Sequence, residues 1–420
     1  MRRKTLLFAL ALLLSPVLNA QIKIDNPKEH GMDPERLSRV DEVIAEAIRD
    51  GEMPGAVLSV VRGNNIVYLK AYGNKSVVPD TVAMTTNTIF DLASLSKCVG
   101  TTLSVMQLIE DGRLRLTDPV KRFIPEFKPW TDPQTGESTD ITIRDLMTHS
   151  SGLSAYYDAD KIVARFGPQQ PDSLMRVIAT EVERNFRPGS DFLYSCLNFI
   201  TLQHILERIT GERLCDYAET HVFAPLGLQH TGYLPLQDDL RTPARHTDWL
   251  PLIAPTEVQA DGTPLLGAVH DPLARLVNGG NSGNAGVFSD AVDLSRTCMM
   301  ILNGGFARAD KKLGFPEPGE RILSRAAIRT MGTVPAENDP SVGRALGWDV
   351  CSAHSGLRGD LFTPETCLMH TGYTGTSILI DRETRTAVVL LTNRVHPTDD
   401  GAVGRLRALV ANIVASSIIW

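Results

Sequence analysis

The sequence carries its most informative motif in Phe90-Asp91-Leu92-Ala93-Ser94-Leu95-Ser96-Lys97. Nowhere else in the chain is a serine followed three residues later by a lysine. The residues after the motif are apolar at helical spacing and run to a stop signal at Gly112: Val99, Leu103, Met106, Leu108 and Ile109. Residues three apart share one face of a helix. Ser94 and Lys97 are therefore predicted to point into the same space from the first turn of a helix.

This pair of side chains suits nucleophilic catalysis. A serine hydroxyl attacks only after a base removes its proton, and an amine whose charge is suppressed by burial can be that base. The start of a helix also offers free backbone N–H groups to a developing oxyanion. The alternative is a helix-capping serine with a surface lysine one turn later. Taken alone, the pair favours that second interpretation.

Two further motifs follow in a fixed order. The first is Phe192-Leu193-Tyr194-Ser195-Cys196, and the second is His370-Thr371-Gly372-Tyr373-Thr374-Gly375. With the serine–lysine pair, they resemble the motif set of the serine β-lactamase and penicillin-binding-protein-like superfamily. The chain is most similar to the class C β-lactamase-related branch, with its esterases and D-aminopeptidases, over roughly residues 30–415. The stretches 146–153 and 286–289 belong to the same resemblance.

The resemblance implies a role for each member of the first two motifs. Ser94 would be the acyl-accepting nucleophile and Lys97 its base or proton relay. Tyr194 would hand a proton to the leaving group and later activate the hydrolytic water. A free tyrosine has a pKa of about 10, so Tyr194 can act as a base only if the charge of Lys97 lowers that pKa.

The third motif would hold the substrate. The resemblance implies an oxyanion hole made of the backbone N–H groups of Ser94 and Tyr373, beside the strand of Thr371. One such donor typically contributes roughly a hundred- to a thousandfold in rate. Gly372 would allow the substrate to approach this strand closely.

Two residues depart from the family pattern. Cys196 stands where the family usually has an asparagine, which puts recognition of an amide side chain in doubt. His370 stands where dedicated β-lactamases have lysine, and a free histidine with a pKa near 6.5 is mostly neutral at pH 7. It would anchor a carboxylate weakly, and Arg394 could supply the charge instead. Singly, Tyr194 could be a buried aromatic and His370 a surface strand residue, but the order of the three motifs favours catalysis.

Strand patterns lie at both ends of the chain, with helical patterns between them. Alternating residues predict strands over 55–61 and 66–72, and apolar β-branched runs predict a hairpin over 376–391. Helical spacing is found over 33–50, 142–147, 171–184, 197–209, 291–302 and 402–413. We therefore expect an α+β fold of the β-lactamase/transpeptidase type, in which one antiparallel sheet is built from both chain ends and flanked by helices. An all-helical lobe is inserted in the middle.

The lobe boundaries follow from the same patterns. The α/β lobe would comprise residues about 30–95 and 286–420, and the helical lobe residues about 96–285. Long connections over 231–285 are expected to line one side of the cleft.

Residues 1–20 have the pattern of an export signal, with a basic start, an apolar run and a small-residue cleavage site at Leu18-Asn19-Ala20. The apolar run is about nine residues, against the roughly 20 that span a bilayer. No cysteine follows the cleavage site, so there is no lipobox. We expect a periplasmic or secreted protein without a permanent membrane anchor, with residues 21–420 as the catalytic domain.

The composition of the chain indicates which classes of ligand and partner it is not expected to bind. The formal net charge of −7 is spread without basic blocks, which argues against nucleic acid. No histidine pair has metal-site spacing with an attendant carboxylate, and no cofactor is expected. The six cysteines are scattered, and Cys351 with Cys367 is the one pair considered for a disulfide.

The sequence thus predicts a secreted serine hydrolase that cleaves an ester or amide through an acyl-enzyme. A D-amino-acid cell-wall peptide, another small molecule or a β-lactam would be the substrate. The alternative is a penicillin-binding or sensor module that is acylated but does not turn over. Lys97 and Tyr194 could activate a water for deacylation, which favours turnover. The oligomeric state stays open.

Overall fold

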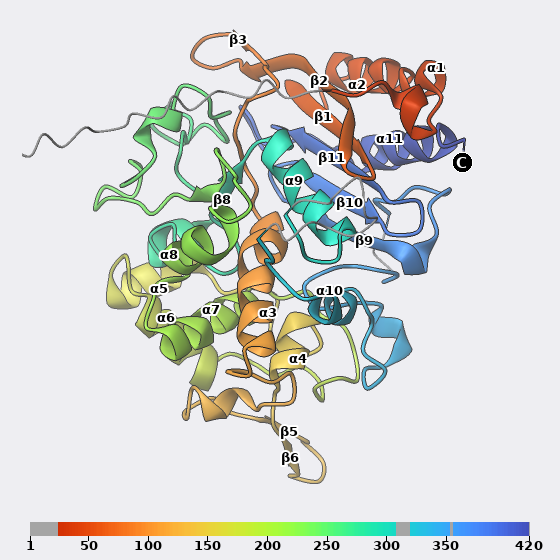
Figure 1. The fold of residues 1–420 in the computed structure, drawn as a ribbon. Helices are drawn as coiled ribbons and strands as arrows, with labels where there is room; N and C mark the ends of the chain where they lie inside the picture. The colour runs from red at the N-terminus through yellow and green to blue at the C-terminus, as the bar shows by residue number, and fades with distance from the viewer. Residues whose placement is uncertain (1–23, 308–319, 353–355, 420) are drawn as a thin grey trace, which may run out of the picture.

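The structure is a computed structural model that describes residues 24–307, 320–352 and 356–419. The predicted export signal lies outside these residues. A six-stranded antiparallel sheet with the order β3-β2-β1-β11-β10-β9 forms the upper part of the molecule (Figure 1). Its strands come from both chain ends: β1 (Gly55–Arg62), β2 (Asn65–Ser76), β3 (Val82–Ala83), β9 (Cys367–Thr371), β10 (Ser377–Asp381) and β11 (Thr386–Thr392).

The central pair of strands, β1 and β11, joins the two chain ends. Val57 lies opposite Leu391, and Val61 lies opposite Ala387. Seven of the eight residues of β1 are buried, because helices cover both faces of the sheet. Its alternate residues therefore pack into two separate hydrophobic cores.

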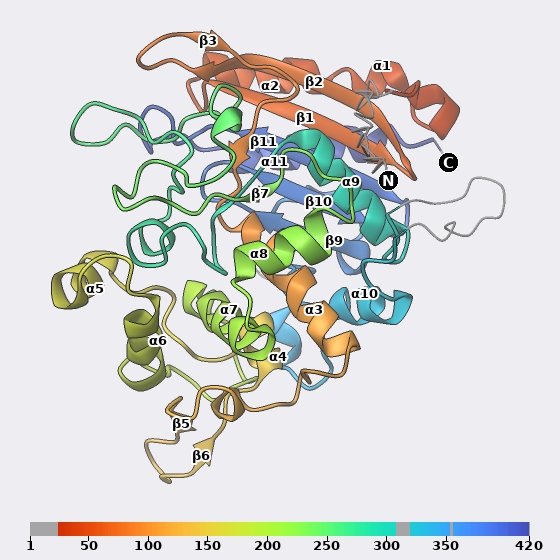
Figure 2. The same cartoon turned by 60° about the vertical axis from the view of Figure 1, so that its left-hand side comes forward.

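One core lies between the sheet and the terminal helices α2 (Val40–Arg49) and α11 (Gly404–Ser416), where Leu58 meets Ile44 and Val410. On the other face, α9 (Ala291–Leu302) packs along β1 and β11. This second core continues into the inserted lobe (Figure 2).

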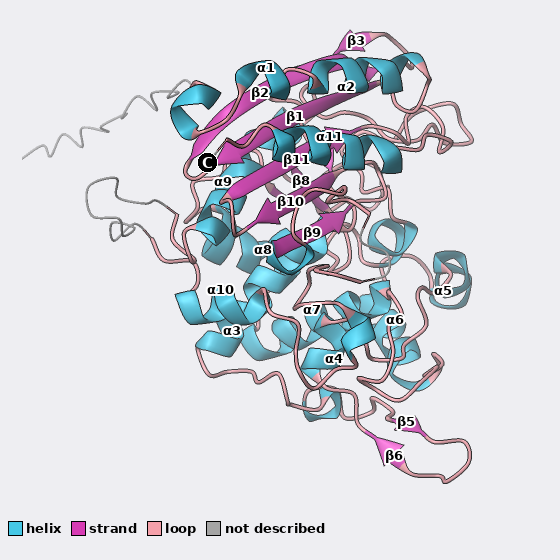
Figure 3. Ribbon diagram, turned by 90° about the vertical axis from the view of Figure 1, so that its right-hand side faces the viewer, coloured by secondary structure: helices cyan, strands magenta, loops and turns pink. Residues whose placement is uncertain are grey.

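The inserted lobe is mainly helical. Its helices are α3 (Leu103–Glu110), α4 (Ile143–Met147), α5 (Ala159–Phe166), α6 (Pro171–Thr180), α7 (Cys196–Thr210) and α8 (Leu214–Ala218), and α10 (Arg325–Met331) packs beside α3. A small hairpin, β5 (Trp130–Thr131) with β6 (Ser138–Thr139), projects from it (Figure 3). A separate three-stranded sheet has the order β4 (Phe90–Asp91), β8 (Val287–Ser289) and β7 (Gly232–Tyr233). The predicted fold class is confirmed.

Two predicted helices differ in detail. The pattern over 33–50 forms two helices, α1 (Pro34–Leu37) and α2, because Arg39, Asp41 and Glu42 donate to carbonyls only three residues back. The helix that begins at Pro171 ends at Thr180, four residues early. Arg184 instead folds back, and its guanidinium donates to the carbonyls of Ala179 and Val182 at the helix end.

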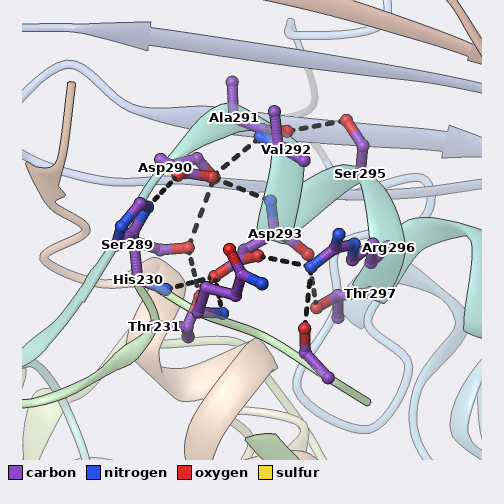
Figure 4. Close-up of polar contacts among 12 residues, drawn as sticks. His230, Thr231, Ser289, Asp290, Ala291, Val292, Asp293, Ser295, Arg296 and Thr297 are labelled. Atoms are coloured by element: carbon purple, nitrogen blue, oxygen red, sulfur yellow. Dashed lines mark hydrogen bonds and ion pairs between the residues drawn. The ribbon is translucent and has the colours of Figure 1, made fainter. Parts of the chain in front are cut away.

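A buried polar network fixes the start of α9 (Figure 4). The Asp290 carboxylate accepts from the backbone N–H groups of Val292 and Asp293, and also contacts His230 Nδ1 at 2.7 Å. Asp293 accepts from the backbone N–H of His230 at 2.7 Å. Burial raises the pKa of Asp293 to about 6, and the charge of Asp290 adds to this effect. The network holds β8 and α9 in place behind the segment that leads to Ser94, because β8 pairs with β4.

Candidate active site

Ser94 lies on a sharp turn between β4 and the helix that follows. Ala93 has φ 46°, a left-handed conformation that is strained for a residue with a Cβ. The Asp91 carboxylate accepts from the Ala93 N–H at 2.8 Å and holds the turn. The helix then begins with a π-helical turn, Lys97–Thr102, before α3. Ser94 thus precedes the helix, whereas the sequence predicted it within the first turn.

Lys97 is completely buried, and its ammonium group contacts three acceptors. Nζ donates to Ser94 Oγ at 2.9 Å and to the carbonyl oxygen of Asn284 at 2.9 Å. It also lies 3.6 Å from Cys196 Sγ. The predicted Ser94–Lys97 pair is therefore formed.

Tyr194 completes this group from a loop that precedes α7. It lines the same cavity as Ser94, and Lys97 and Ser94 both act to lower the pKa of its hydroxyl. Lys97 Nζ also lies 5.0 Å from the centroid of the Tyr194 ring. The segment of Ser94 and Lys97 and the distant segment of Tyr194 thus place a serine hydroxyl, an ammonium group and a phenol beside one another.

The protonation states of Lys97 and Tyr194 differ from the expectation that burial suppresses the charge of Lys97 and that the pKa of Tyr194 is lowered. Burial acts to lower the pKa of Lys97, but the negative charges that Cys196 and Tyr194 can carry outweigh it, so that pKa is raised. Burial raises the pKa of Tyr194, and the charge of Lys97 offsets this only in part. At neutral pH, Lys97 is therefore charged and Tyr194 is protonated. The Tyr194–Lys97 pair can therefore accept a proton only after it has first lost one.

Cys196 is the first residue of α7, and its Sγ lies 3.6 Å from Lys97 Nζ. Burial raises the pKa of its thiol, while Lys97 opposes the shift, so the thiol stays protonated. Cys196 is not among the residues that line the cavity beside Ser94. All six cysteines are free thiols, including the pair Cys351 and Cys367.

The turn after β9 is fastened to the segment just before Ser94. Thr374 Oγ1 donates to the carbonyl of Asp91 at 2.7 Å, and Thr376 Oγ1 donates to the carbonyl of Leu92 at 3.1 Å. A Cβ on Gly372 would lie 2.4 Å from that Leu92 oxygen. Packing against the Leu92 carbonyl therefore requires a glycine at position 372. The sequence alone explained this glycine only by close approach of the substrate.

These hydrogen bonds join the two segments that carry the backbone N–H groups of Ser94 and Tyr373. Within the described residues, neither the Ser94 N–H nor the Tyr373 N–H donates to a protein acceptor. Tyr373 is 57% exposed, lines the cavity and stacks with His270 at 5.8 Å between ring centroids. Thr371 is also exposed and lines the cavity.

His370 is buried at the edge of the same cavity. Its Nδ1–H donates to the Thr371 carbonyl at 2.9 Å, and within the described chain its Nε2 has no hydrogen-bond partner. Burial, then the charges of Arg344 and Lys97, hold the pKa of His370 well below its usual value. His370 is therefore neutral in mildly acidic solution as well as at pH 7, and it does not supply a positive charge.

The cavity has a volume of about 710 Å³ and is lined by three arginines: Arg344, Arg394 and Arg407. Arg394 donates to Asp399 at 2.8 Å and lies 4.7 Å from the centroid of the Tyr373 ring, so its charge is already paired. Arg407 supports the β9 turn, since its Nη2 donates to the carbonyls of Gly372 and Thr376. Among the described residues that line the cavity, Asp349 is the only acidic one.

Arg344 differs from the other two. Its side chain is 4% exposed, and its Nη1 lies 3.3 Å from the Asp349 carboxylate. Nε and Nη2 are buried and have no hydrogen-bond partner in the part of the chain that the structure describes. Sequence reasoning missed Arg344 and Arg407, because no motif or periodicity marks either position. A buried guanidinium with unused donors at a cavity wall is a candidate site for an anion.

The long connection over 231–285 does not line this cavity, contrary to expectation. It contributes from behind, since its Asn284 supplies a carbonyl to Lys97. His270, in the same connection, stacks on Tyr373, and its backbone N–H donates to the Asp91 carboxylate at 2.7 Å.

Among residues 24–307, 320–352 and 356–419, no three or more His, Cys, Asp and Glu side chains gather in a metal-binding arrangement. No helix in those ranges combines the length and apolar character needed to cross a bilayer.

Comparisons with known proteins agree with this geometry. A family model described as Beta-lactamase matches residues 40–412. A protein of Salmonella enteritidis PT4 is 30% identical over 93% of this chain and 90% of its own length, and one of Escherichia coli K12 is 30% identical over 94% and 91%. Both relatives are provisionally named D-alanyl-D-alanine carboxypeptidase.

Solved structures share the fold. EstCE1, a hydrolase with promiscuous acyltransferase activity, is 24% identical with a TM-score of 0.68, and the match covers 91% of this chain and 99% of EstCE1. The octameric penicillin-binding protein homologue from Pyrococcus abyssi is 21% identical with a TM-score of 0.64, over 90% of this chain and 76% of its own. Fold and relatives together define a serine hydrolase. The chain belongs to the Beta-lactamase family.

We predict that Gly372→Ala destabilises the protein by about 1–3 kcal/mol, because the new methyl group overlaps the Leu92 carbonyl. Gly356→Ala is the matched control, since Gly356 lines the same cavity and its added Cβ would meet nothing within 4 Å. Urea unfolding of both variants measures the difference. Equal stability of the two variants would show that the contact between the β9 turn and Leu92 is loose.

Proposed function

We propose that this protein is an exported serine hydrolase of the carboxypeptidase type that removes a C-terminal residue from a D-alanyl peptide. The observation that carries the proposal is the group of Ser94, Lys97 and Tyr194 beside a cavity that also holds Arg344. The names of the relatives support the substrate class. Residues 1–20 would direct export and be cleaved, which leaves residues 21–420 as the catalytic domain. We also propose the lobe boundaries given above, near residues 95 and 285.

In the proposed acylation step, the Tyr194–Lys97 pair has first lost one proton. The Tyr194 oxygen accepts the proton of Ser94 Oγ, and Oγ bonds to the carbonyl carbon of the substrate. The N–H groups of Ser94 and Tyr373 stabilise the oxyanion, because both are free to donate. Tyr194 then gives its proton to the departing amine as the C–N bond breaks, and Ser94 is left as an ester.

In the proposed deacylation step, a water molecule replaces the amine. Tyr194 accepts a proton from this water, whose oxygen bonds to the acyl carbon. The bond to Ser94 Oγ breaks, and Oγ takes the proton back from Tyr194. Lys97 stays charged throughout, and its contact with Ser94 Oγ stabilises the negative charge that develops on the oxygens.

The substrate's free carboxylate would bind Arg344. A carboxylate accepts two parallel hydrogen bonds from a guanidinium, and Nε and Nη2 are the pair of donors that Arg344 leaves unused. His370 is neutral and Arg394 is paired with Asp399, so neither is the better anchor. Thr371, at the cavity wall, would hydrogen-bond the substrate backbone.

The alternative function is a penicillin-binding or sensor module that stays acylated. An ester or a β-lactam would form the same bond to Ser94, so only the lifetime of the adduct separates the two functions. The proximity of Tyr194 to Ser94 favours turnover, because the side chain that would activate the hydrolytic water lies beside the acylated serine.

The direct test is intact-mass spectrometry after mixing the protein with esters, D-alanyl-D-alanine peptides and penicillins. We expect one acyl mass on the wild type, located on the peptide that contains Ser94, and decay of the peptide and ester adducts within minutes. Ser94→Ala should show no adduct. A labelled Ser94→Ala variant would contradict the assignment of the nucleophile, and adducts that never decay would favour the sensor module.

A second prediction concerns pH. The pKa values of both Lys97 and Tyr194 are raised, so the form of the pair that has lost a proton is a small fraction at pH 7. That fraction grows about tenfold per pH unit, and kcat/KM for a neutral ester should rise with pH between 6 and 9 in the same way. His370 should add no acidic limb, because its pKa is far below this range. A rate that is flat or falls over this window would contradict the proposed base.

A third prediction separates the anchor from the chemistry. Arg344→Met should lower kcat/KM for a carboxylate-bearing peptide by roughly ten- to a hundredfold, the loss expected for a charge-assisted pair of hydrogen bonds. The corresponding peptide amide, which has no carboxylate, should be nearly unaffected. Lys128→Met, on the surface of the inserted lobe, controls for the lost charge. Equal losses on acid and amide substrates would show that Arg344 does not bind the carboxylate.

A further inference from the structure

His149, from the stretch 146–153 that the proposed mechanism does not use, lies directly against Tyr194. The centroids of the two rings are 4.3 Å apart, and the planes are inclined by 32°. His149 is completely buried and has φ 57°, a left-handed conformation that is uncommon for histidine. A strained and buried residue in contact with a proposed proton carrier needs an explanation.

The backbone on both sides of Tyr194 is bound to this one residue. The Leu193 N–H donates to the His149 carbonyl at 3.0 Å. The Ser195 N–H donates to His149 Nδ1 at 3.1 Å. The loop that carries Tyr194 contains no helix or strand. These two hydrogen bonds therefore fix the position of the Tyr194 backbone.

Neighbouring contacts strengthen the same attachment. Ser195 Oγ donates to the Ser154 carbonyl at 2.7 Å, and the Cys196 N–H donates to the Ala155 carbonyl at 2.8 Å. Asn198, on the first turn of α7, places its side-chain amide 3.3 Å from His149 Nδ1. The loop after α4 and the start of α7 thus hold the Tyr194 segment between them.

The chemistry of the imidazole fits this task. Nδ1 accepts a hydrogen bond from a backbone N–H, so in the neutral ring the proton is on Nε2. Burial, then the charges of Arg344 and Lys97, keep the pKa of His149 well below its usual value. The ring therefore adds no positive charge beside Tyr194. It supplies a hydrogen-bond acceptor and a flat surface at a place where the backbone must be left-handed.

We propose that His149 is a positioning residue that fixes the backbone and the ring plane of Tyr194 relative to Ser94. The inference rests on the proposed function, in which Tyr194 carries protons to and from Ser94. A displacement of about 1 Å in such a group can reduce a rate roughly a hundredfold. Loss of His149 should therefore reduce the rate of the chemical step and leave substrate affinity almost unchanged, because His149 does not line the cavity.

Two variants separate the two features of the ring. His149→Asn tolerates the left-handed backbone and keeps an acceptor near the position of Nδ1, but removes the ring. His149→Phe keeps a ring and removes the acceptor. The control is His246→Asn, because His246 also has a left-handed backbone, φ 54°, and its ring stacks on Trp249 at 4.0 Å in a region far along the chain from the site.

We expect kcat for an ester substrate to fall about ten- to a hundredfold in both His149 variants, with KM changed less than about twofold. His246→Asn should have the kcat of the wild type and a similar change in melting temperature. Where one His149 variant does not fold, as judged by circular dichroism, the other one and Asn198→Leu carry the test. Asn198→Leu should give a smaller loss of kcat, because it removes the weaker hydrogen bond to Nδ1.

The decisive comparison is the double variant His149→Asn with Tyr194→Phe. If His149 acts through Tyr194, the double variant should be no more than about twofold slower than Tyr194→Phe alone. If His149→Asn lowers kcat as much in the Tyr194→Phe variant as in the wild type, the inference is overturned while the proposed function stands. Wild-type kcat in both single His149 variants would have the same consequence. Wild-type activity of Tyr194→Phe would overturn both.

Discussion

The buried ammonium of Lys97 is the charge on which the rest of the site depends. Taking an ammonium ion out of water costs several kcal/mol unless the protein replaces its hydration, and here Ser94 Oγ and the Asn284 carbonyl do so. Both acceptors are fixed by other parts of the fold, since β8 follows Asn284 directly and the turn of Ala93 presents Ser94. The small sheet, the π-helical turn and the start of α7 all meet at this one nitrogen. An uncharged side chain at this position would leave those acceptors without a donor.

The sequence predicted the fold class and most element boundaries, because they follow from local patterns. Apolar periodicity located α9 and the β10–β11 hairpin, and the motif order identified Ser94, Lys97 and Tyr194 as candidates. What it did not reveal depends on contacts between distant segments. Arg344 stands in a stretch without a motif, and its importance is visible only from the cavity that surrounds it. The pKa directions of Lys97 and Tyr194 were likewise out of reach, since burial and mutual charge decide them together.

The cavity wall is positively charged, whereas the whole chain carries a net negative charge. The chain has a formal net charge of −7, yet the cavity wall carries Arg344, Arg394 and Arg407. Arg394 and Arg407 are occupied with holding the protein together, through Asp399 and through the carbonyls of Gly372 and Thr376. Within the described residues, buried donors without a partner remain on Arg344, at Nε and Nη2, and on Arg407, at Nε. The proposed anchor at Arg344 therefore does not require a positive charge on His370.

The pairing of β1 with β11 has a consequence for how the chain is made. Val57 finds its partner at Leu391, so the centre of the large sheet cannot form until nearly the whole polypeptide has left the ribosome. Contacts of such long sequence separation also fold slowly. Tyr373 is likewise made long after the Ser94 segment that its turn is fastened to. The cavity beside Ser94 is therefore completed only when nearly the whole chain has been synthesised.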